Sequence, residues 1–301
     1  MKIRDSISYK IFQVINLTFF ILFMFLCVYP FYYMFIYSLS NPNEALKGNV
    51  VFLPRGITLI NYQRIIQDND ILHAAFISAS RVIVGTIYQV LTSSFFAFLL
   101  TQKALPKLFR KVVLRMTIIT MYVGAGLIPA YLLYRSLGLI NNFLVYILPG
   151  TIIPFFVILV KTFIEGLPDS LQESAVLDGA GYTRIFFNII LPVSLPVIAS
   201  ISIFAAVGQW SNWQDNYFFA LDRSLTTLQY LLYQYLQNQI ARMMAASSGP
   251  VQVIDGQTLS VVTTMSAKTT ITAIVTIPVL LVYPFLQKYF MSGLLLGAVK
   301  E

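Results

Sequence analysis

The chain is poor in the side chains that carry out catalysis. It has one cysteine, Cys27, and one histidine, His73, which excludes an intramolecular disulfide, a cysteine-built metal site and a histidine cluster. Glu173 and Asp178 are the most prominent acidic pair, but residues five apart are poorly aligned on a helix face, and no nucleophile or metal-binding set accompanies them. No Gly-x-x-x-x-Gly-Lys-[Ser/Thr] loop is present, so ATP chemistry does not reside in this chain. The sequence predicts a protein that is not an enzyme and holds no metal or cofactor.

The acidic pair belongs to a polar segment, residues 173–192, which lies between two long apolar blocks. Apolar residues in 171–177 recur near helical spacing, and the pattern breaks at Gly179 and Gly181, where glycine supplies the φ freedom that a sharp reversal needs. A second short amphipathic piece, 182–190, is predicted to stop at the proline that closes the segment. Two short helices joined by a glycine turn form a knob suited to a partner's cleft. We interpret this segment as a coupling element.

The spacing within this segment carries a family resemblance. The pattern Glu-Ala-Ala, three residues, Gly, nine residues, Ile, one residue, Leu-Pro is met by Glu173, Ser174, Ala175, Gly179, Ile189, Leu191 and Pro192. Ser174 replaces the usual first alanine with another small residue. The segment resembles the EAA loop in the membrane subunits of binding-protein-dependent ABC importers. The run Asp178-Gly179-Ala180, followed by Phe186, Pro192 and Pro196, is similar to the carbohydrate-uptake branch and its maltose-type smaller permease.

This resemblance implies partners and residue roles. It assigns coupling to an ATPase to Glu173, Ser174, Ala175, Asp178, Gly179, Ala180, Leu191 and Pro192. Glu173 would accept hydrogen bonds from a basic residue of one of two separate ATP-binding subunits, which bind ATP and Mg²⁺. The other implied partners are a homologous second permease, forming a heterodimer, and an extracellular or periplasmic sugar-binding protein. Residues 208–213, 222–229 and 291–301 look like the LplC/YtcP-type permeases, which are associated with oligosaccharide or polysaccharide uptake.

Composition places the chain in a membrane. Hydrophobic residues make up 57% of the chain and charged residues 11%, and the mean hydropathy is +0.75, whereas soluble domains have about a quarter charged residues. The net charge of +8 does not indicate a nucleic-acid partner, because the basic residues lie next to apolar segments, as the positive-inside bias predicts. The sequence therefore predicts an all-α integral membrane protein in contact with lipid.

Apolar runs predict six transmembrane helices, at residues 19–37, 71–100, 112–134, 143–163, 192–213 and 269–289. Basic residues before the first run and between 103 and 115 place the N-terminus and that loop in the cytoplasm, and parity returns the C-terminus there. The resemblance implies that residues 1–301 form a single permease domain of the type I ABC importer fold. It has an external loop at 38–71, a cytoplasmic EAA coupling loop at 165–191, and an external segment at 214–267 with an amphipathic helix. The resemblance implies a multi-pass protein of the bacterial inner membrane.

Polar and aromatic side chains gather where the fifth predicted span meets the outer face. Together with Gln89, on the polar stripe of the second span, the candidate substrate-pathway residues are Trp210, Asn212, Trp213, Asp215, Asn216 and Tyr217. Aromatic faces beside amides and a carboxylate suit a sugar, although tryptophan and tyrosine also gather at membrane interfaces for amphipathic reasons alone. A loop containing Gly249, Pro250, Asp255 and Gly256 is the candidate contact with the binding protein.

Arg81 and Lys161 are the ionisable residues nearest to the interior of a predicted span. We place Arg81 at the outer interface and expect Lys161 to extend to the inner one; a buried functional charge at Arg81 is the alternative. These residues bear on a competing function, a secondary transporter or channel subunit for a small polar solute. Ion-coupled transport usually requires ionisable groups well inside the spans. The importer interpretation is therefore favoured.

Overall fold

A computed structural model describes residues 7–67, 69–247 and 265–281, and the secondary structure within these ranges is entirely helical. The chain divides into two compact units. The smaller unit comprises residues 1–69 and 235–276, and the larger comprises 70–234 and 277–301. The helical content agrees with the predicted all-α class.

The smaller unit is built on α1 (Ile7–Ser38), which is long and apolar enough to cross a membrane. It contains the predicted span 19–37 and continues through Pro30. Most of its side chains between residues 9 and 31 are exposed, as is usual for a helix whose apolar surface faces lipid or another protein. The first predicted span is therefore present as one helix.

The loop after α1 is ordered by buried hydrogen bonds. It contains α2 (Pro42–Leu46) and α3 (Ile60–Ile66). Asn61 of α3 is fully buried, and its amide donates to the backbone oxygens of Ser38 at 2.8 Å and Ser40 at 3.0 Å. These bonds satisfy carbonyls at the end of α1 that have no partner within the helix.

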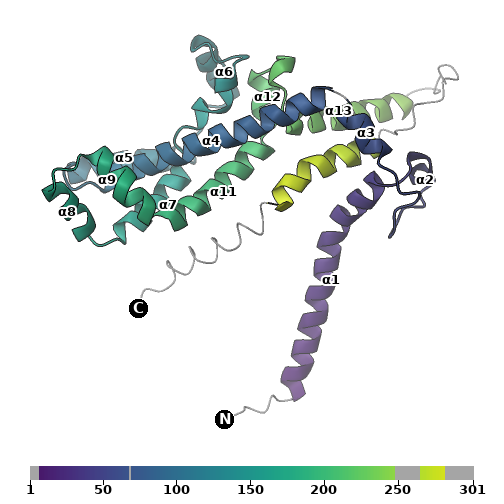
Figure 1. Ribbon diagram of the computed structural model, residues 1–301, viewed down its shortest axis with the longest axis horizontal. Helices are drawn as coiled ribbons and strands as arrows, with labels where there is room; N and C mark the ends of the chain where they lie inside the picture. The colour runs from purple at the N-terminus through teal and green to yellow at the C-terminus, as the bar shows by residue number, and fades with distance from the viewer. Residues whose placement is uncertain (1–6, 68, 248–264, 282–301) are drawn as a thin grey trace. The chain divides into compact units, whose positions relative to one another are not determined.

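The larger unit is organised along α4 (Asn69–Thr101), a second helix long and apolar enough to span a membrane. Figure 1 shows α7 (Pro154–Glu165) and α11 (Leu195–Ser211) running beside it. Phe98 of α4 and Val157 of α7 belong to one buried apolar cluster with Ile201 of α11. Close packing of this kind holds helices together where lipid supplies no hydrophobic driving force.

Two of the predicted spans are bent rather than straight. The 3₁₀ turns η1 (Phe143–Tyr146) and η2 (Leu148–Gly150) meet α7 at 47°. Pro149, Gly150 and Pro154 fall at this bend, where they interrupt regular helix hydrogen bonding. The fifth predicted span begins after an 87° bend that separates α11 from the preceding short helices.

Those short helices correct the predicted end of the coupling loop. The chain passes through α9 (Tyr182–Ile185), the π-helical turn η3 (Phe186–Ile190) and α10 (Leu191–Val193) before it bends. The prediction that this helical piece stops at Pro192 is wrong, because Pro192 sits in the first turn of α10, where its missing N–H breaks no helix hydrogen bond.

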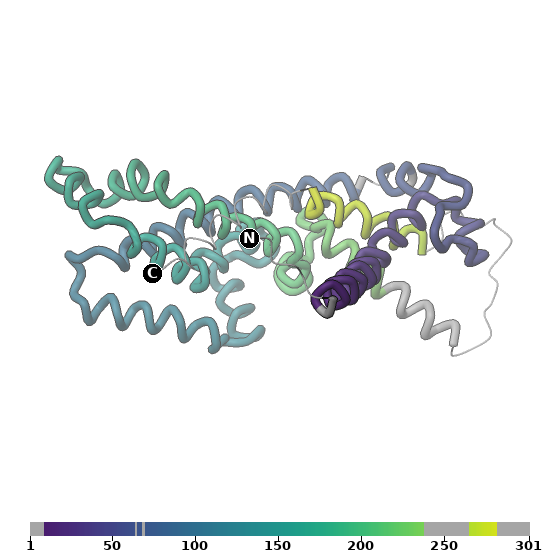
Figure 2. The backbone as a smooth tube through the Cα atoms, turned by 90° about the horizontal axis from the view of Figure 1, so that it is seen from below, coloured from purple at the N-terminus to yellow at the C-terminus, as the bar shows by residue number. Residues whose placement is uncertain are grey.

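The third predicted span, 112–134, is wrong as a continuous helix. The chain forms α5 (Lys107–Ile119) and α6 (Leu127–Ser136) instead, and Figure 2 shows it turning between them. Gly124 and Gly126 lie in the break, and glycine is a poor helix former. By length and composition the described residues contain two membrane-crossing helices, or up to four if each bent pair is one span. Six spans remain a prediction.

The predicted amphipathic helix of the external segment is present as α13 (Leu228–Ser247), after α12 (Gln214–Phe219) and η4 (Arg223–Leu225). An apolar helix at Met265–Leu281 covers part of the last predicted span. The remainder of that span and the predicted binding-protein contacts lie outside the described residues; those contacts are Gly249, Pro250, Asp255 and Gly256.

Candidate functional site

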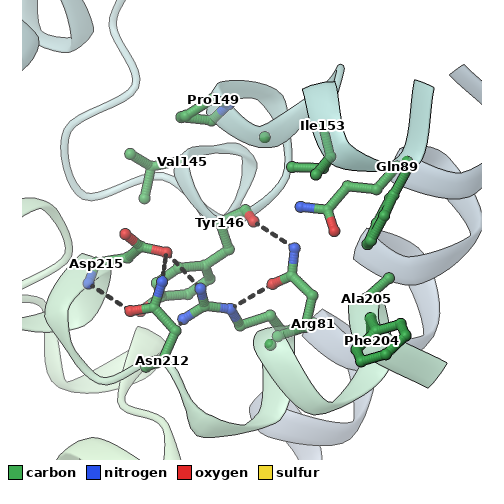
Figure 3. Close-up of a pocket in the computed structure, with 14 residues that line it drawn as sticks. Arg81, Gln89, Val145, Tyr146, Pro149, Ile153, Phe204, Ala205, Asn212 and Asp215 are labelled. Atoms are coloured by element: carbon green, nitrogen blue, oxygen red, sulfur yellow. Dashed lines mark hydrogen bonds and ion pairs between the residues drawn. The ribbon is translucent and has the colours of Figure 1, made fainter. Parts of the chain in front are cut away.

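A cavity of about 370 Å³ lies within the larger unit. Helices α4, α7 and α11, the turns η1 and η2, and the start of α12 contribute to its wall (Figure 3). Its polar lining consists of Arg81, Gln89, Tyr146, Gln209, Asn212 and Asp215. Phe156 and Phe204 are among its apolar lining residues. A mainly apolar cavity with a few convergent polar groups is typical of a small-molecule site.

Arg81 is the most enclosed charge of this cavity, with 2% of its surface exposed. Its Nε donates to Gln209 Oε1 at 2.8 Å, its Nη1 donates to the backbone oxygen of Asn212 at 2.9 Å, and its Nη2 forms an ion pair with Asp215. The guanidinium carbon lies 4.5 Å from the centre of the Tyr146 ring. A buried charge is tolerated when it is paired and hydrogen-bonded in this way.

The partners of Arg81 are themselves held in place. Asn212 Nδ2 donates to Asp215 Oδ2 at 2.9 Å, and Asn212 Oδ1 accepts from the backbone N–H of Gln214 at 2.9 Å. Gln209 Nε2 donates to the backbone oxygen of Tyr146 at 3.4 Å. The resulting network, drawn in Figure 3, ties α4 to η1, α11 and α12.

Gln89 borders the same cavity from α4 and differs from the other polar residues in its bonding. Its side chain is 8% exposed, and within the described ranges its amide makes no hydrogen bond. The amide lies directly against Gly150, where a Cβ would collide with Nε2. Glycine at position 150 therefore makes room for the Gln89 amide.

The structure brings together three of the residues predicted for the substrate pathway, Gln89, Asn212 and Asp215. Trp210, Trp213, Asn216 and Tyr217 do not line the cavity. Trp213 stacks on Tyr233 with ring centres 4.0 Å apart, and Tyr217 packs edge-on against both rings. These aromatic contacts join α12 to α13, which accounts for the clustering seen in the sequence.

Asn216 is fully buried as a structural residue. Its Oδ1 accepts from the backbone N–H of Thr227 at 2.7 Å, and its Nδ2 donates to the backbone oxygen of Ala220 at 2.5 Å. Both partners belong to the chain that leaves α12. Its amide therefore fixes this loop and is not available to a ligand.

Sequence reasoning did not identify Tyr146 and Gln209 as cavity residues, and it favoured an interfacial position for Arg81. Burial of Arg81 against Gln209 and Asp215 corresponds instead to the alternative of a buried charge. The signal was present in the chain, because Arg81 and Asp215 are opposite charges close to the ends of two apolar runs. The sequence does not show that Arg81 and Asp215 pair, because they are far apart along the chain.

The EAA-like segment forms α8 (Ser170–Leu177) and a glycine turn. Gly179 has φ +74°, a conformation that side chains disfavour, whereas Gly181 has φ −69° and needs no glycine. The expectation of a turn is confirmed at Gly179 and wrong at Gly181. Ala175 is buried, its carbonyl accepts from Ala180 N–H at 3.0 Å, and Leu177 is 89% exposed. The helix therefore packs on its small residue and presents an apolar side chain outward.

The acidic residues of this segment face a lysine that follows α4. Lys103 Nζ donates to Asp169 Oδ2 at 2.7 Å and lies 3.7 Å from Glu173 Oε1. The hydrogen bond to Asp169 raises the pKa of Lys103 above its ordinary value. Beside it, Gln102 Nε2 donates to Gln172 Oε1 at 3.1 Å. The end of α4 is thus in contact with α8.

The segment after the turn is anchored in the apolar cluster of the larger unit. Ile185, Phe186 and Ile190 are buried there. The Phe186 ring packs edge-on against Phe95 of α4, with ring centres 5.1 Å apart. Leu191 is partly buried and Pro192 is exposed. Figure 1 places α8 and α9 at one end of α4 and α12 near the other.

Comparison with known proteins identifies the family. Residues 89–295 match the model of the binding-protein-dependent transport system inner membrane component. The chain is 33% identical to the polygalacturonan/rhamnogalacturonan transport system permease protein YtcP of Bacillus subtilis, over 97% of this chain and 99% of the relative. It is 32% identical to protein LplC of the same organism, over 91% and 89%.

A solved structure shares the fold. The chain aligns with one chain of a bacterial ABC transporter involved in the import of the acidic polysaccharide alginate, with a TM-score of 0.82 and 24% identity, over 96% of this chain and 100% of that one. The helices and bends described above are therefore those of an ABC importer permease. Family match, relatives and fold agree, and the chain belongs to the binding-protein-dependent transport system inner membrane components.

Proposed function

We propose that this chain is a permease subunit of an ATP-driven ABC importer that takes up oligosaccharides or polysaccharide fragments. The family match supports this function, as do the relative named for polygalacturonan/rhamnogalacturonan transport and the solved structure of a transporter involved in alginate import. The single observation that carries it is the exposed α8 turn, because a short helix that presents Glu173 and Leu177 outward suits docking to another subunit. The protein would be a multi-pass component of the bacterial inner membrane.

Coupling is proposed to occur through residues 165–191. Glu173 and Asp178 are exposed and would receive hydrogen bonds from the ATPase. Leu177 would enter an apolar part of the ATPase cleft, while Ala175 and Ala180 keep α8 close to the core. Leu191 and Pro192, at the start of α10, would transmit the movement of the loop to the helices behind it. Two separate ATPase subunits would bind ATP and Mg²⁺ and drive the motion by closing.

The cavity beside Arg81 is proposed to be part of the translocation pathway. A homologous second permease would complete that pathway, and an extracellular or periplasmic sugar-binding protein would deliver the substrate. The proposed topology has six spans with both termini in the cytoplasm, so α8 would face the ATPase and the cavity would lie toward the other side. External loops 38–71 and 214–267 would then meet the sugar-binding protein.

The test is to co-purify the tagged chain with its candidate ATPase and to measure ATPase stimulation by the loaded binding protein. Glu173→Ala is expected to reduce stimulation strongly and Gly179→Arg to abolish assembly, because the bulky cation occupies the turn. Glu165→Ala is the matched control, since Glu165 is also an exposed glutamate but ends α7, is not among the residues proposed to contact the ATPase, and pairs within its own helix with Lys161 at 2.6 Å. It should behave as wild type.

A second candidate function is secondary transport of a small polar solute. The observation that favours it is the buried Arg81–Asp215 pair, since ionisable groups within a membrane domain are used for ion coupling. Uptake into vesicles that contain this chain and its partner permease but no ATPase distinguishes the two functions. Accumulation driven by a proton or sodium gradient, with assembly unaffected in both loop variants, would replace the importer proposal.

A further inference from the structure

We infer that the cavity of the larger unit binds an uncharged, hydroxyl-rich sugar ring and selects against a ring that carries a carboxylate. The inference rests on the proposed function, adds a substrate class and a site to it, and sets this chain apart from the similar proteins named for polygalacturonan/rhamnogalacturonan and for alginate. It is carried by two features of the cavity, the unpartnered amide of Gln89 and the unequal exposure of Arg81 and Asp215.

Gln89 is a buried polar side chain without a hydrogen-bond partner among the described residues. A largely enclosed amide that borders a cavity and has no protein partner is usually hydrogen-bonded to a ligand or to water there. The amide offers two donors and one acceptor, which matches neighbouring hydroxyl groups that both donate and accept. The lack of a side chain at Gly150 leaves room for the Gln89 amide at the cavity wall, because a Cβ at position 150 would collide with it.

Arg81 is not free to bind a carboxylate. Each of its three nitrogens already donates to a protein oxygen, one face of the guanidinium covers the Tyr146 ring, and 2% of the residue is exposed. Its low exposure leaves little of the guanidinium within reach of a ligand in the cavity. The positive charge of Arg81 is therefore paired and hydrogen-bonded within the protein.

Asp215 is the member of the pair that the cavity exposes. Its side chain is 28% exposed, and only its Oδ2 takes the bonds from Arg81 and Asn212. Within the described ranges Oδ1 accepts no hydrogen bond, which leaves it available to a sugar hydroxyl. A ligand carboxylate at the same place would meet like charge in a poorly solvated site, which is unfavourable.

The rest of the wall suits the carbon face of a sugar ring. Phe204 borders the cavity, and Pro149, Ile153 and Ala205 add apolar surface (Figure 3). The volume of about 370 Å³ is at the lower end of the range of roughly 300–1,000 Å³ for ligand sites. The cavity therefore fits a short saccharide unit rather than a long chain.

The experiment measures equilibrium binding of saccharides to the purified transporter complex in nanodiscs, without the sugar-binding protein. The probes are radiolabelled neutral disaccharides (galactobiose, maltose and cellobiose) and digalacturonate, which differs from galactobiose only in its carboxylates. Wild type should bind at least one neutral disaccharide about tenfold more tightly than digalacturonate. Gln89→Ala and Gly150→Ala should each weaken neutral binding by about tenfold.

Gln102→Ala is the matched control for Gln89→Ala, because Gln102 lies at the end of α4 with the same 8% exposure and has protein partners away from the cavity. It should leave binding unchanged. Asp215→Asn keeps a hydrogen-bonding side chain but removes the negative charge, so it should raise digalacturonate affinity about tenfold and change neutral binding little. If Asp215→Asn fails to assemble, the inference is still tested by two measurements: the relative affinity of wild type for neutral disaccharides and digalacturonate, and the affinity of Gln89→Ala for the neutral disaccharides.

Three results overturn the inference. Unchanged affinity in Gln89→Ala would mean that the saccharide does not contact the Gln89 amide, which removes the observation that places the site in this cavity. Failure of all the neutral disaccharides to bind would exclude a saccharide site. Tighter binding of digalacturonate by wild type would reverse the proposed selection. Each binding measurement uses a complex whose assembly and ATPase stimulation have been verified. A failure of the saccharide-site inference is therefore distinguishable from a failure of the proposed importer function.

Discussion

Two ion-pair clusters lie along α4 and differ in their surroundings. In the first half of the helix, Arg81 is almost completely enclosed and pairs with Asp215 inside a hydrogen-bonded network. Just after its last turn, Lys103 is 69% exposed and pairs with Asp169 and Glu173 on the surface. The same pairing of opposite charges therefore occurs once as a fixed internal connection and once as an exchangeable surface contact.

The difference in burial determines what each cluster can do. A buried pair whose partners are hydrogen-bonded is costly to separate, so the Arg81 network keeps α4, η1, α11 and α12 in one arrangement. A surface pair contributes little to stability, so Glu173 can exchange Lys103 for a basic residue of another subunit. About twenty residues of α4 separate the clusters, roughly 30 Å at 1.5 Å per residue, which makes α4 a rigid connection between cavity and coupling loop.

The largest expected effect follows from breaking the buried pair. Arg81→Met leaves Asp215 without its cation, and we expect it to lower the free energy of unfolding by about 3–5 kcal/mol. Thermal unfolding of the purified protein in detergent, followed by tryptophan fluorescence, measures the change. The double variant Arg81→Met/Asp215→Leu should recover much of the loss, since apolar residues can replace a buried pair. A single variant as stable as wild type would show that the network does not hold these helices.

An intermediate effect is expected at the coupling turn. Gly179→Ala places a side chain at φ +74°, which should cost about 1–2 kcal/mol and reduce ATPase stimulation by distorting the loop. Gly181→Ala is the matched control two residues away, because φ there is −69° and a Cβ would meet no atom within 4 Å. Unfolding temperature and ATPase stimulation are compared for both variants. Equal behaviour of the two would contradict the assignment of the turn to Gly179.

The smallest effect is expected at the exposed cluster. Lys103→Ala should leave the unfolding temperature unchanged, because a pair this exposed is screened by solvent. Asp169 raises the pKa of Lys103, so the ion pair contributes fully below the ordinary lysine pKa and is lost only as the pH rises through the raised value. Unfolding temperatures of wild type and variant measured between pH 6 and 9 should therefore run parallel. A pH-dependent difference in this range would mean that the cluster is more enclosed than the structure indicates.

Local sequence features were sufficient for several elements. The apolar runs predicted α1 and α4, the periodic leucines and tyrosines predicted α13, and the EAA spacing predicted α8 with its turn at Gly179. The break between α5 and α6 was missed because a hydropathy run does not distinguish one helix from two short ones. The path through Pro192 was missed because a proline can end a helix or occupy the first turn of the next one.

The sequence by itself determined the family, the helical class and the position of α8 with its turn at Gly179, since these depend on composition and on spacing within short stretches. Only the tertiary structure decided which polar residues share a site. Arg81 meets Asp215, and Gln89 meets Gly150, across separations along the chain that no periodicity records. It also assigned Trp213 and Asn216 to packing rather than to the cavity. Burial and pairing arise when helices pack together, and they decide whether a side chain is structural or available to a ligand.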